Sequence, residues 1–122
     1  MTITFPGGER VDARFEGKTL ATEQDGSMPS PFELFLASIG TCAGVYVARF
    51  FRQRGIATEG LSLRQSMHVN SESRRIDRIE LVIDLPPGFP ESYRDAVVRA
   101  ASLCAVKKHL ENPPEIVVRA DV

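Results

Sequence analysis

The hydrophobic positions in the centre of the chain predict a long helix. Between residues 32 and 50 they recur every three to four residues, a spacing that gathers apolar side chains on one helical face. The segment opens with the letters SPFE at residues 30–33, where serine can cap the helix, proline suits its first position and glutamate completes a capping box. Most other faces stay apolar or small until Arg49, and the pattern stops at Gly55. We therefore expect this helix to be covered on nearly all sides.

Two alternating segments follow and predict a β-hairpin. Apolar and polar residues alternate over residues 61–69 and again over residues 79–85, the period-two pattern of half-buried strands. The polar segment at residues 70–75 reverses the chain direction between them. The letters PPG at residues 86–88 end the second strand, because proline cannot donate a hydrogen bond to a ladder.

The N-terminal residues predict a small β-meander. Short β-like segments lie at residues 2–5, 11–15 and 18–22, and the turn signals Gly7-Gly8 and Glu16-Gly17 separate them.

The C-terminal third predicts a second helix and one more strand. The helix is expected from Pro90 to about Asn112, with apolar residues at helical spacing that include Cys104, and the strand at residues 116–118. The resulting order β-β-β-α-β-β-α-β has no regular βα alternation. It predicts a single α+β domain over residues 1–122, with mainly antiparallel pairing.

Composition and charge narrow the class of protein. Of 122 residues, 43% are hydrophobic and 25% charged, with a formal net charge of -1, as in an ordinary globular domain. No long basic block occurs, so we expect small-molecule or protein partners and neither nucleic acid nor a membrane. The N-terminus lacks the layout of a signal peptide, which predicts a cytoplasmic protein. The uncharged run at residues 34–48 is short for a membrane span and is interpreted as a core helix.

The apolar central helix raises the question of oligomeric state. A small domain buries a limited fraction of its surface, and a homodimer would supply the missing cover. A monomer would also suffice if its sheet covered one side of the helix and its second helix the other. The sequence leaves both arrangements open.

The two cysteines, Cys42 and Cys104, each lie in the middle of a predicted helix, which favours a redox pair. The alternative is that each is a small hydrophobic core residue. The 61 residues between them exclude a CxxC motif and the paired CxxC spacing of a zinc site. A mixed zinc site with His68 and His109 is a more distant alternative, and we expect no metal and no cofactor.

The surroundings of the two cysteines are predicted to differ. In a continuous helix Lys107 and Lys108 would share a face with Cys104 and favour its thiolate, or they would complement the helix dipole at the C-terminus. Cys42 lies about three turns into its helix, too far for the dipole alone to lower its pKa. We therefore expect its activation to come from elsewhere in the fold.

Two segments resemble the OsmC/Ohr family of thiol peroxidases, and in particular its short OsmC-like members. They are residues 29–42, with the letters PSPFELFLASIGTC, and residues 103–110, with the letters LCAVKKHL. The likeness extends over nearly the whole chain, including the hairpin. The resemblance implies an intertwined homodimer whose antiparallel sheets surround two central helices, with two active sites at the subunit interface. It also implies reduction of organic hydroperoxides without metal or flavin.

The resemblance assigns roles to both cysteines. Cys42 would be the peroxidatic thiolate that becomes a sulfenic acid, and Cys104 would resolve it as a disulfide. A dithiol or a lipoylated protein would then serve as the reductant.

Three further residues correspond less closely to the family pattern. The family glutamate follows the helix-opening proline, where this chain has Phe32, so Glu33 is displaced by one residue and its capping role explains it without catalysis. The family arginine follows a Gly-Gly turn, and Arg10 is likewise displaced by one residue. Arg10 and Arg14 share a strand face, and either could activate Cys42 of the partner subunit or be an exposed strand charge.

The leading hypothesis is a cytoplasmic peroxidase that acts on organic hydroperoxides under oxidative stress. The apolar walls expected from four aromatic residues would suit an apolar peroxide better than hydrogen peroxide. The alternative is a non-catalytic protein of the same fold that binds a small ligand or senses redox state. The four aromatic residues are Phe32, Phe35, Tyr46 and Phe50.

Overall fold

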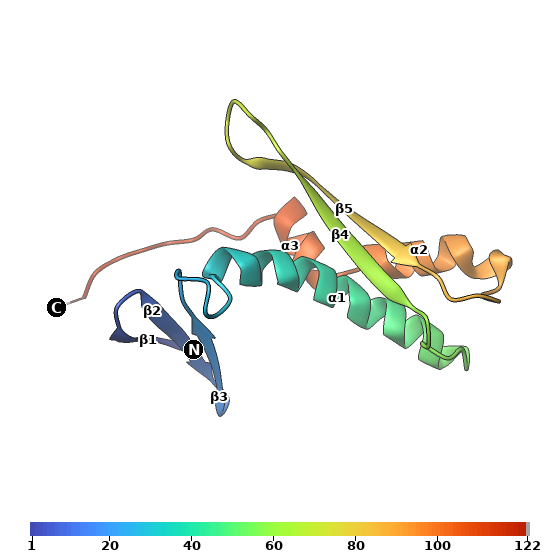
Figure 1. The fold of residues 1–122 in the computed structure, drawn as a ribbon, viewed down its shortest axis with the longest axis horizontal. Helices are drawn as coiled ribbons and strands as arrows, with labels where there is room; N and C mark the ends of the chain where they lie inside the picture. Colours follow the sequence, from blue (N-terminus) through green and yellow to red (C-terminus); the bar gives the residue numbers. More distant parts are fainter. Residues whose placement is uncertain (122) are drawn as a thin grey trace. The chain divides into compact units, whose positions relative to one another are not determined.

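A computed structural model describes residues 1–121, which divide into two compact units, residues 1–38 and the residues from Ile39 onward. The elements are a three-stranded sheet, a two-stranded sheet, three α-helices and one 3₁₀ turn (Figure 1). Both sheets are antiparallel, which confirms the predicted α+β class.

The N-terminal unit contains the predicted meander. Strands β1 (Thr2–Gly7), β2 (Arg10–Phe15) and β3 (Lys18–Thr22) pair antiparallel in the order β1-β2-β3. Gly8 and Gly17 lie at the two turns with positive φ angles of 59° and 74°, a conformation that glycine adopts without steric cost.

Helix α1 (Pro31–Gln53) begins and ends where the sequence predicts. The backbone amide of Glu33 donates to the Ser30 hydroxyl at 3.2 Å, and the amide of Ser30 donates to the Glu33 carboxylate at 3.0 Å. This reciprocal pair is the predicted capping box. At the other end Gly55 has a φ of 65°, and its amide donates to the carbonyl of Arg52 at 3.2 Å, which terminates the helix.

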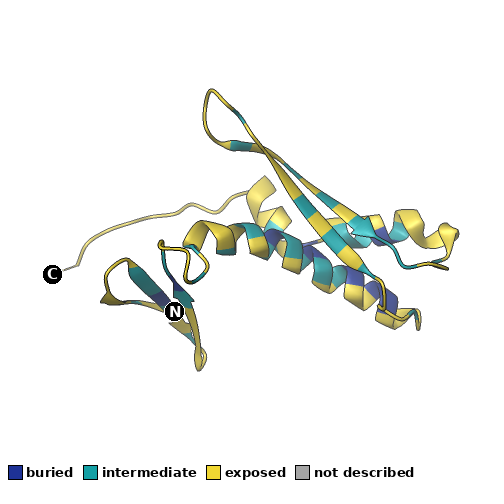
Figure 2. Ribbon diagram, in the orientation of Figure 1, coloured by how far each residue is buried: buried dark blue, intermediate teal, exposed yellow. Residues whose placement is uncertain are grey.

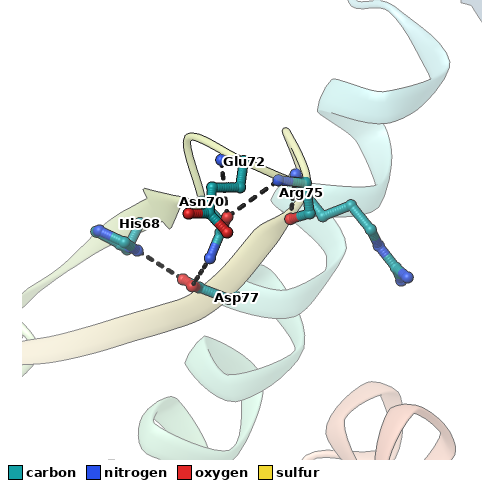
Figure 3. Close-up of polar contacts among 6 residues, drawn as sticks. His68, Asn70, Glu72, Arg75 and Asp77 are labelled. Carbon is teal, nitrogen blue, oxygen red and sulfur yellow. Dashed lines mark hydrogen bonds and ion pairs between the residues drawn. The ribbon is translucent and has the colours of Figure 1, made fainter.

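The hairpin is formed by β4 (Ser62–Val69) and β5 (Ile76–Asp84), paired antiparallel over their whole length. Its tip is stabilised by Asn70, whose side-chain oxygen accepts hydrogen bonds from the amides of Glu72 and Ser73 at 2.9 and 3.0 Å (Figure 3). The predicted reversal over the polar segment is confirmed.

The core of the second unit lies between α1, the hairpin and the following helix. Val47, Phe50, Phe51 and Val97 are buried together, and the inward side chains of the hairpin pack on them. A two-stranded sheet needs such support, because an isolated hairpin is marginally stable in water. The inward hairpin residues in this cluster are Leu63, Ile83 and Leu85, with Leu61 just before β4.

The predicted second helix is interrupted, which corrects the expectation of one helix through Cys104. A 3₁₀ turn, η1 (Glu91–Tyr93), leads into α2 (Arg94–Ser102), and α3 (Ala105–Glu111) follows after Leu103 and Cys104. Cys104 has an extended backbone, with φ −49° and ψ 127°, and its side chain is 1% exposed. The periodicity continues through the break without glycine or proline, so nothing local marks it, and burial of Cys104 overrides helix propensity.

The strand predicted at residues 116–118 is also wrong. Within residues 1–121 the chain after α3 carries no strand, and it runs as an extended, exposed segment (Figures 1 and 2). Ile116, Val117 and Val118 are 84%, 71% and 90% exposed. A β-prone segment needs a neighbouring edge to become a strand, and no described strand pairs with it. The observed order of strands and α-helices within residues 1–121 is therefore β-β-β-α-β-β-α-α, in which the first three strands are the meander.

Helix α1 satisfies the length and composition of a membrane span, with a mean hydropathy of 1.6 over its most apolar window. A core helix of a soluble protein meets the same criteria, so the match carries little weight by itself. Only 28% of that window is buried within the chain, so much of the apolar surface of the helix is exposed in the single chain.

The contact between Gly40 and Gln65 allows a prediction about how the hairpin packs on α1. A Cβ atom at this position would lie 2.6 Å from Oε1 of Gln65 in β4, so the end of the Gln65 side chain occupies space that only a glycine at position 40 leaves free. We expect Gly40→Ala to leave the free energy of unfolding close to that of the wild type, because displacing the Gln65 amide offsets the better helix propensity of alanine. Chemical denaturation measures this change.

Gln65→Ala provides the matched background for this test. Without the Gln65 amide, Gly40→Ala should raise the free energy of unfolding by about 1 kcal/mol, the usual gain in a helix interior. An equal effect of Gly40→Ala in both backgrounds would contradict the proposed contact.

Candidate active site

The two cysteines meet in the second unit, and both are free thiols. Cys42 projects from the middle of α1, and Cys104 lies at the N-cap of α3. The two side chains are hydrogen-bonded to each other. The fold therefore brings the two cysteine side chains into contact, and their role as a redox pair stays a prediction.

The break between α2 and α3 is what brings the pair together. The amide of Leu103 closes α2 on the carbonyl of Ala100 at 3.1 Å, and the amide of Lys108 starts α3 on the carbonyl of Cys104 at 3.1 Å. The first amides of α3 have no intrahelical acceptor, as at any helix start. The backbone N–H groups of Ala105 and Val106 donate to the sulfur of Cys42.

The environment of Cys42 stabilises its thiolate. The hydrogen bond from Cys104 is the largest cause that lowers the pKa of the Cys42 thiol, followed by the hydrogen bond from the amide of Val106. Smaller contributions come from the Ala105 amide and from the positive charge of Arg49, while desolvation opposes them. The main causes that lower this pKa come from Cys104 and the start of α3, outside the helix that carries Cys42.

The environment of Cys104 has the opposite effect. Burial raises the pKa of the Cys104 thiol above its ordinary value, and the hydrogen bond with Cys42 adds to the rise. Lys107 does not reverse this, since its ammonium pairs with Glu111 at 3.2 Å. The expectation that lysine charges would favour a Cys104 thiolate is therefore wrong, because the helix break and burial dominate.

The pair is thus asymmetric in acidity and in access. The pKa of Cys42 is lowered and its side chain is partly exposed, whereas the pKa of Cys104 is raised and the residue is 1% exposed. A thiolate next to a protonated thiol can attack an electrophile. If this attack oxidises its sulfur, the neighbouring thiol can then attack that sulfur.

Sequence reasoning missed Arg49. This arginine follows Cys42 by seven residues, two turns later on the same side of α1, and its charge favours the Cys42 thiolate. The spacing i, i+7 from a cysteine in a predicted helix was the available signal. The amides of Ala105 and Val106 offered no such signal, because the helix break that frees them is invisible in the sequence.

A small apolar cavity of about 170 Å³ adjoins Cys104. It lies between α1, the hairpin and the last helices, and its single charged lining residue is Lys107. The other lining residues are Ile39, Ala43, Ile79, Leu81, Ala101, Cys104 and Leu110.

The N-terminal candidates have local partners. Arg10 forms a two-point ion pair with Asp12, with both nitrogen–oxygen distances 3.0 Å, and Asp12 is 2% exposed. This pair lowers the pKa of Asp12 and raises that of Arg10. Arg14 is exposed on β2, and its charge also lowers the pKa of Asp12, as expected if it shares a face with Arg10. Glu33 belongs to the capping box, and the catalytic roles of these three residues stay predictions.

The four aromatic residues divide into two pairs. Phe32 and Phe35 stack with ring centroids 5.5 Å apart in the first turns of α1, where both are exposed. Phe50 is mostly buried in the core, and together with Tyr46 it lines a groove between α1 and α2.

The histidines lie in separate local contacts. Nδ1 of His68 lies 2.6 Å from the carboxylate of Asp77 at the hairpin tip (Figure 3). Nδ1 of His109 lies 2.7 Å from the carbonyl oxygen of Ala105. In the described part of the chain, no three or more His, Cys, Asp or Glu side chains gather as a metal site would require.

Fold and site together describe a small α+β protein in which a thiol from a long central helix contacts a buried thiol. The sequence matches the OsmC-like protein family over residues 24–119, and the protein therefore belongs to this family. The resemblance carried by the two cysteine motifs is confirmed. No curated protein matches the sequence.

Two solved structures share this fold. One is from Psychrobacter arcticus 273-4 and is described as an osmotic stress induced and detoxification response protein. It has a TM-score of 0.73 and 18% identity, over 88% of this chain and 84% of its own. The other, a hypothetical protein from Aquifex aeolicus VF5, has a TM-score of 0.66 and 16% identity, over 92% and 86% of the two chains.

The hydrogen bond between the thiols generates a prediction about pH dependence. Cys104→Ala removes the main cause that lowers the pKa of Cys42, so its thiolate should form at higher pH than in the wild type. Alkylation of Cys42 by iodoacetamide, followed by mass spectrometry across pH, measures this shift.

Arg49→Gln should move the same profile in the same direction by a smaller amount. Arg52→Gln, on the same helix, is the matched control and should leave the profile unchanged. Identical profiles for the wild type and Cys104→Ala would contradict the role of the thiol contact.

Proposed function

We propose that this protein is a thiol peroxidase that reduces organic hydroperoxides. The observation that carries the proposal is the asymmetric pair, in which an acidified and partly exposed Cys42 contacts a buried Cys104. An inert pair of core cysteines would need neither the arginine charge nor the two amide donors.

The proposed reaction begins at Cys42. Its thiolate attacks one oxygen of the hydroperoxide, the O–O bond breaks, and the leaving alkoxide takes a proton to become an alcohol. Cys42 is now a sulfenic acid. The sulfur of Cys104 then attacks that of Cys42, a disulfide forms and the hydroxyl leaves as water. Two electrons have passed from the thiols to the peroxide.

A dithiol reductant would complete the cycle. Its first thiolate attacks the disulfide, its second releases the protein, and the reductant becomes the disulfide. A lipoylated protein has the required chemistry. We place this cycle in the cytoplasm, where the reducing environment keeps both cysteines free.

The surroundings of the pair support an apolar substrate. The cavity beside Cys104 is lined almost entirely by apolar side chains, and burial of an alkyl or aryl group there is favourable at about 25 cal/mol per Å². Hydrogen peroxide gains nothing from such a surface. The detoxification role in the description of the Psychrobacter relative is consistent with a function of this kind.

The proposal predicts that both thiols are consumed together. A slight excess of cumene hydroperoxide added to the reduced protein should convert Cys42 and Cys104 into one intramolecular disulfide. Cys104→Ser should instead accumulate a sulfenic acid at Cys42, and Cys42→Ser should slow peroxide consumption by about a hundredfold or more. Thiol counting by mass spectrometry, with a sulfenic acid trap, measures all three.

Hydrogen peroxide is the matched substrate control and should react more slowly with the wild type. Unchanged thiols with both peroxides would refute the peroxidase and favour a non-catalytic ligand-binding member of the family. Equal rates would refute the preference for organic peroxides.

We also propose that the protein is a homodimer. Val45 on α1 is 47% exposed, although most of the face of α1 toward the hairpin and α2 is covered. Within residues 1–121 both strands of the hairpin have a free edge, and no described strand pairs with the segment that contains Ile116. A second copy would cover these surfaces.

Val45→Glu tests the dimer. Val45 belongs to no part of the buried core, so the substitution should leave the chain folded, but a carboxylate buried at an interface should weaken association by about a hundredfold or more. Light scattering coupled to size exclusion should show a dimer for the wild type and a monomer for the variant. Val98→Glu, at a position 52% exposed on α2, is the control. A wild-type monomer, or a dimer unaffected by Val45→Glu, would refute this interface.

A further inference from the structure

The groove between α1 and α2 concentrates positive charge that the chain does not neutralise. It has a volume of about 600 Å³, and three of its lining residues are arginines, Arg49, Arg54 and Arg99. No acidic residue lines it, and no ion pair involves these arginines within residues 1–121. By contrast, Arg10, Arg64, Arg78 and Arg94 each have a carboxylate partner.

Aromatic rings hold two of the three guanidinium groups in place. The Arg54 guanidinium lies 3.6 Å from the ring centroid of Phe50 and 5.4 Å from that of Tyr93, and the Arg49 guanidinium lies 5.5 Å from that of Tyr46. Such stacking uses the flat face of a guanidinium and leaves its edge N–H groups available. Nη1 of Arg54 donates to the carbonyl of Phe50 at 3.4 Å, and its other edge N–H groups remain for a ligand. The groove therefore offers positioned donors of fixed charge.

Apart from Gln53 and Tyr46, the rest of the groove is apolar. Phe50, Ala96, Ala100 and Leu103 contribute to its lining, and Leu103 is 52% exposed. Three cations beside an apolar surface suit a molecule with an anionic head and an apolar body. Arginine donors in a planar fork match a carboxylate in particular.

We propose that this groove binds an amphipathic carboxylic acid. Its carboxylate accepts hydrogen bonds from the arginines, and its aliphatic or aromatic body lies on the Phe50 and Leu103 surface. The ligand neutralises charge that the folded chain leaves uncompensated, and it shields apolar area from water. The site requires neither cysteine, and it shares with the thiol site only Arg49, whose charge favours the Cys42 thiolate.

Decanoate is the probe, and decanol is its neutral match of equal chain length. Isothermal titration calorimetry at low ionic strength, with the full chain carrying both Cys42→Ser and Cys104→Ser, keeps redox chemistry out of the measurement. Decanoate should bind, decanol should bind at least about tenfold more weakly, and added salt should weaken only the decanoate.

Arg99 is the residue to vary, because within residues 1–121 it takes part in none of the ion pairs or cation–π contacts. Arg99→Gln should weaken decanoate binding by about tenfold, Arg99→Lys should retain part of it, and Arg52→Gln, an arginine on α1 outside the groove, should bind as tightly as the parent protein. Unchanged thermal melting shows that each variant is folded.

Several results would overturn the proposal. These are no binding of decanoate, equal binding of decanol, and equal weakening by Arg52→Gln and Arg99→Gln. Tight binding of a polyglutamate peptide that depends on Arg99, without decanoate binding, would also overturn it and assign the groove to an acidic protein partner. The peroxidase can fail its own test without affecting any of these outcomes.

Discussion

The hydrogen bond between Cys42 and Cys104 is the contact on which the chemistry of the molecule depends. It joins residues that are 62 positions apart, and it is the largest cause that lowers the pKa of Cys42. In Cys104 it adds to the rise in pKa that burial causes. Without the contact, Cys42 would keep only the smaller effects of two amides and Arg49, and Cys104 would be a small buried hydrophobic group.

The helix break at Leu103 and Cys104 makes this contact possible. The break removes helical hydrogen bonds between α2 and α3. The amides at the start of α3 therefore have no helical acceptor, and they donate to the sulfur of Cys42. The same irregularity therefore places the second thiol and supplies donors for the first. Local loss of regular structure at a site of this kind is common where function needs a specific geometry.

Helix α1 connects this site to the other features of the protein. One face packs on the hairpin and α2, Cys42 lies beside that face, and Arg49 continues along the same side toward the arginine groove. The face that carries Val45 is left uncovered by the single chain. One helix thus carries core packing, the thiol site, part of a cationic groove and a surface suited to a second subunit.

The sequence by itself determined the local elements. The capping box at Ser30 and Glu33, the alternation of the hairpin and the glycine turns of the meander depend on neighbouring residues, so their positions were predictable within a few residues. The two cysteine motifs also identified the family. Arg49 was within reach of the same reasoning, since its spacing from Cys42 is a local property of the helix.

Only the tertiary structure decided the break in the second helix, the contact of the thiols and the direction of each pKa shift. These depend on burial and on donors brought from distant parts of the chain, and helical periodicity continues unchanged through the break. In the segment with Ile116, local propensity predicts an element that the tertiary structure does not form. Its β-prone residues predict a strand, but a strand exists only where another edge accepts its hydrogen bonds, and that edge is a property of the assembled fold.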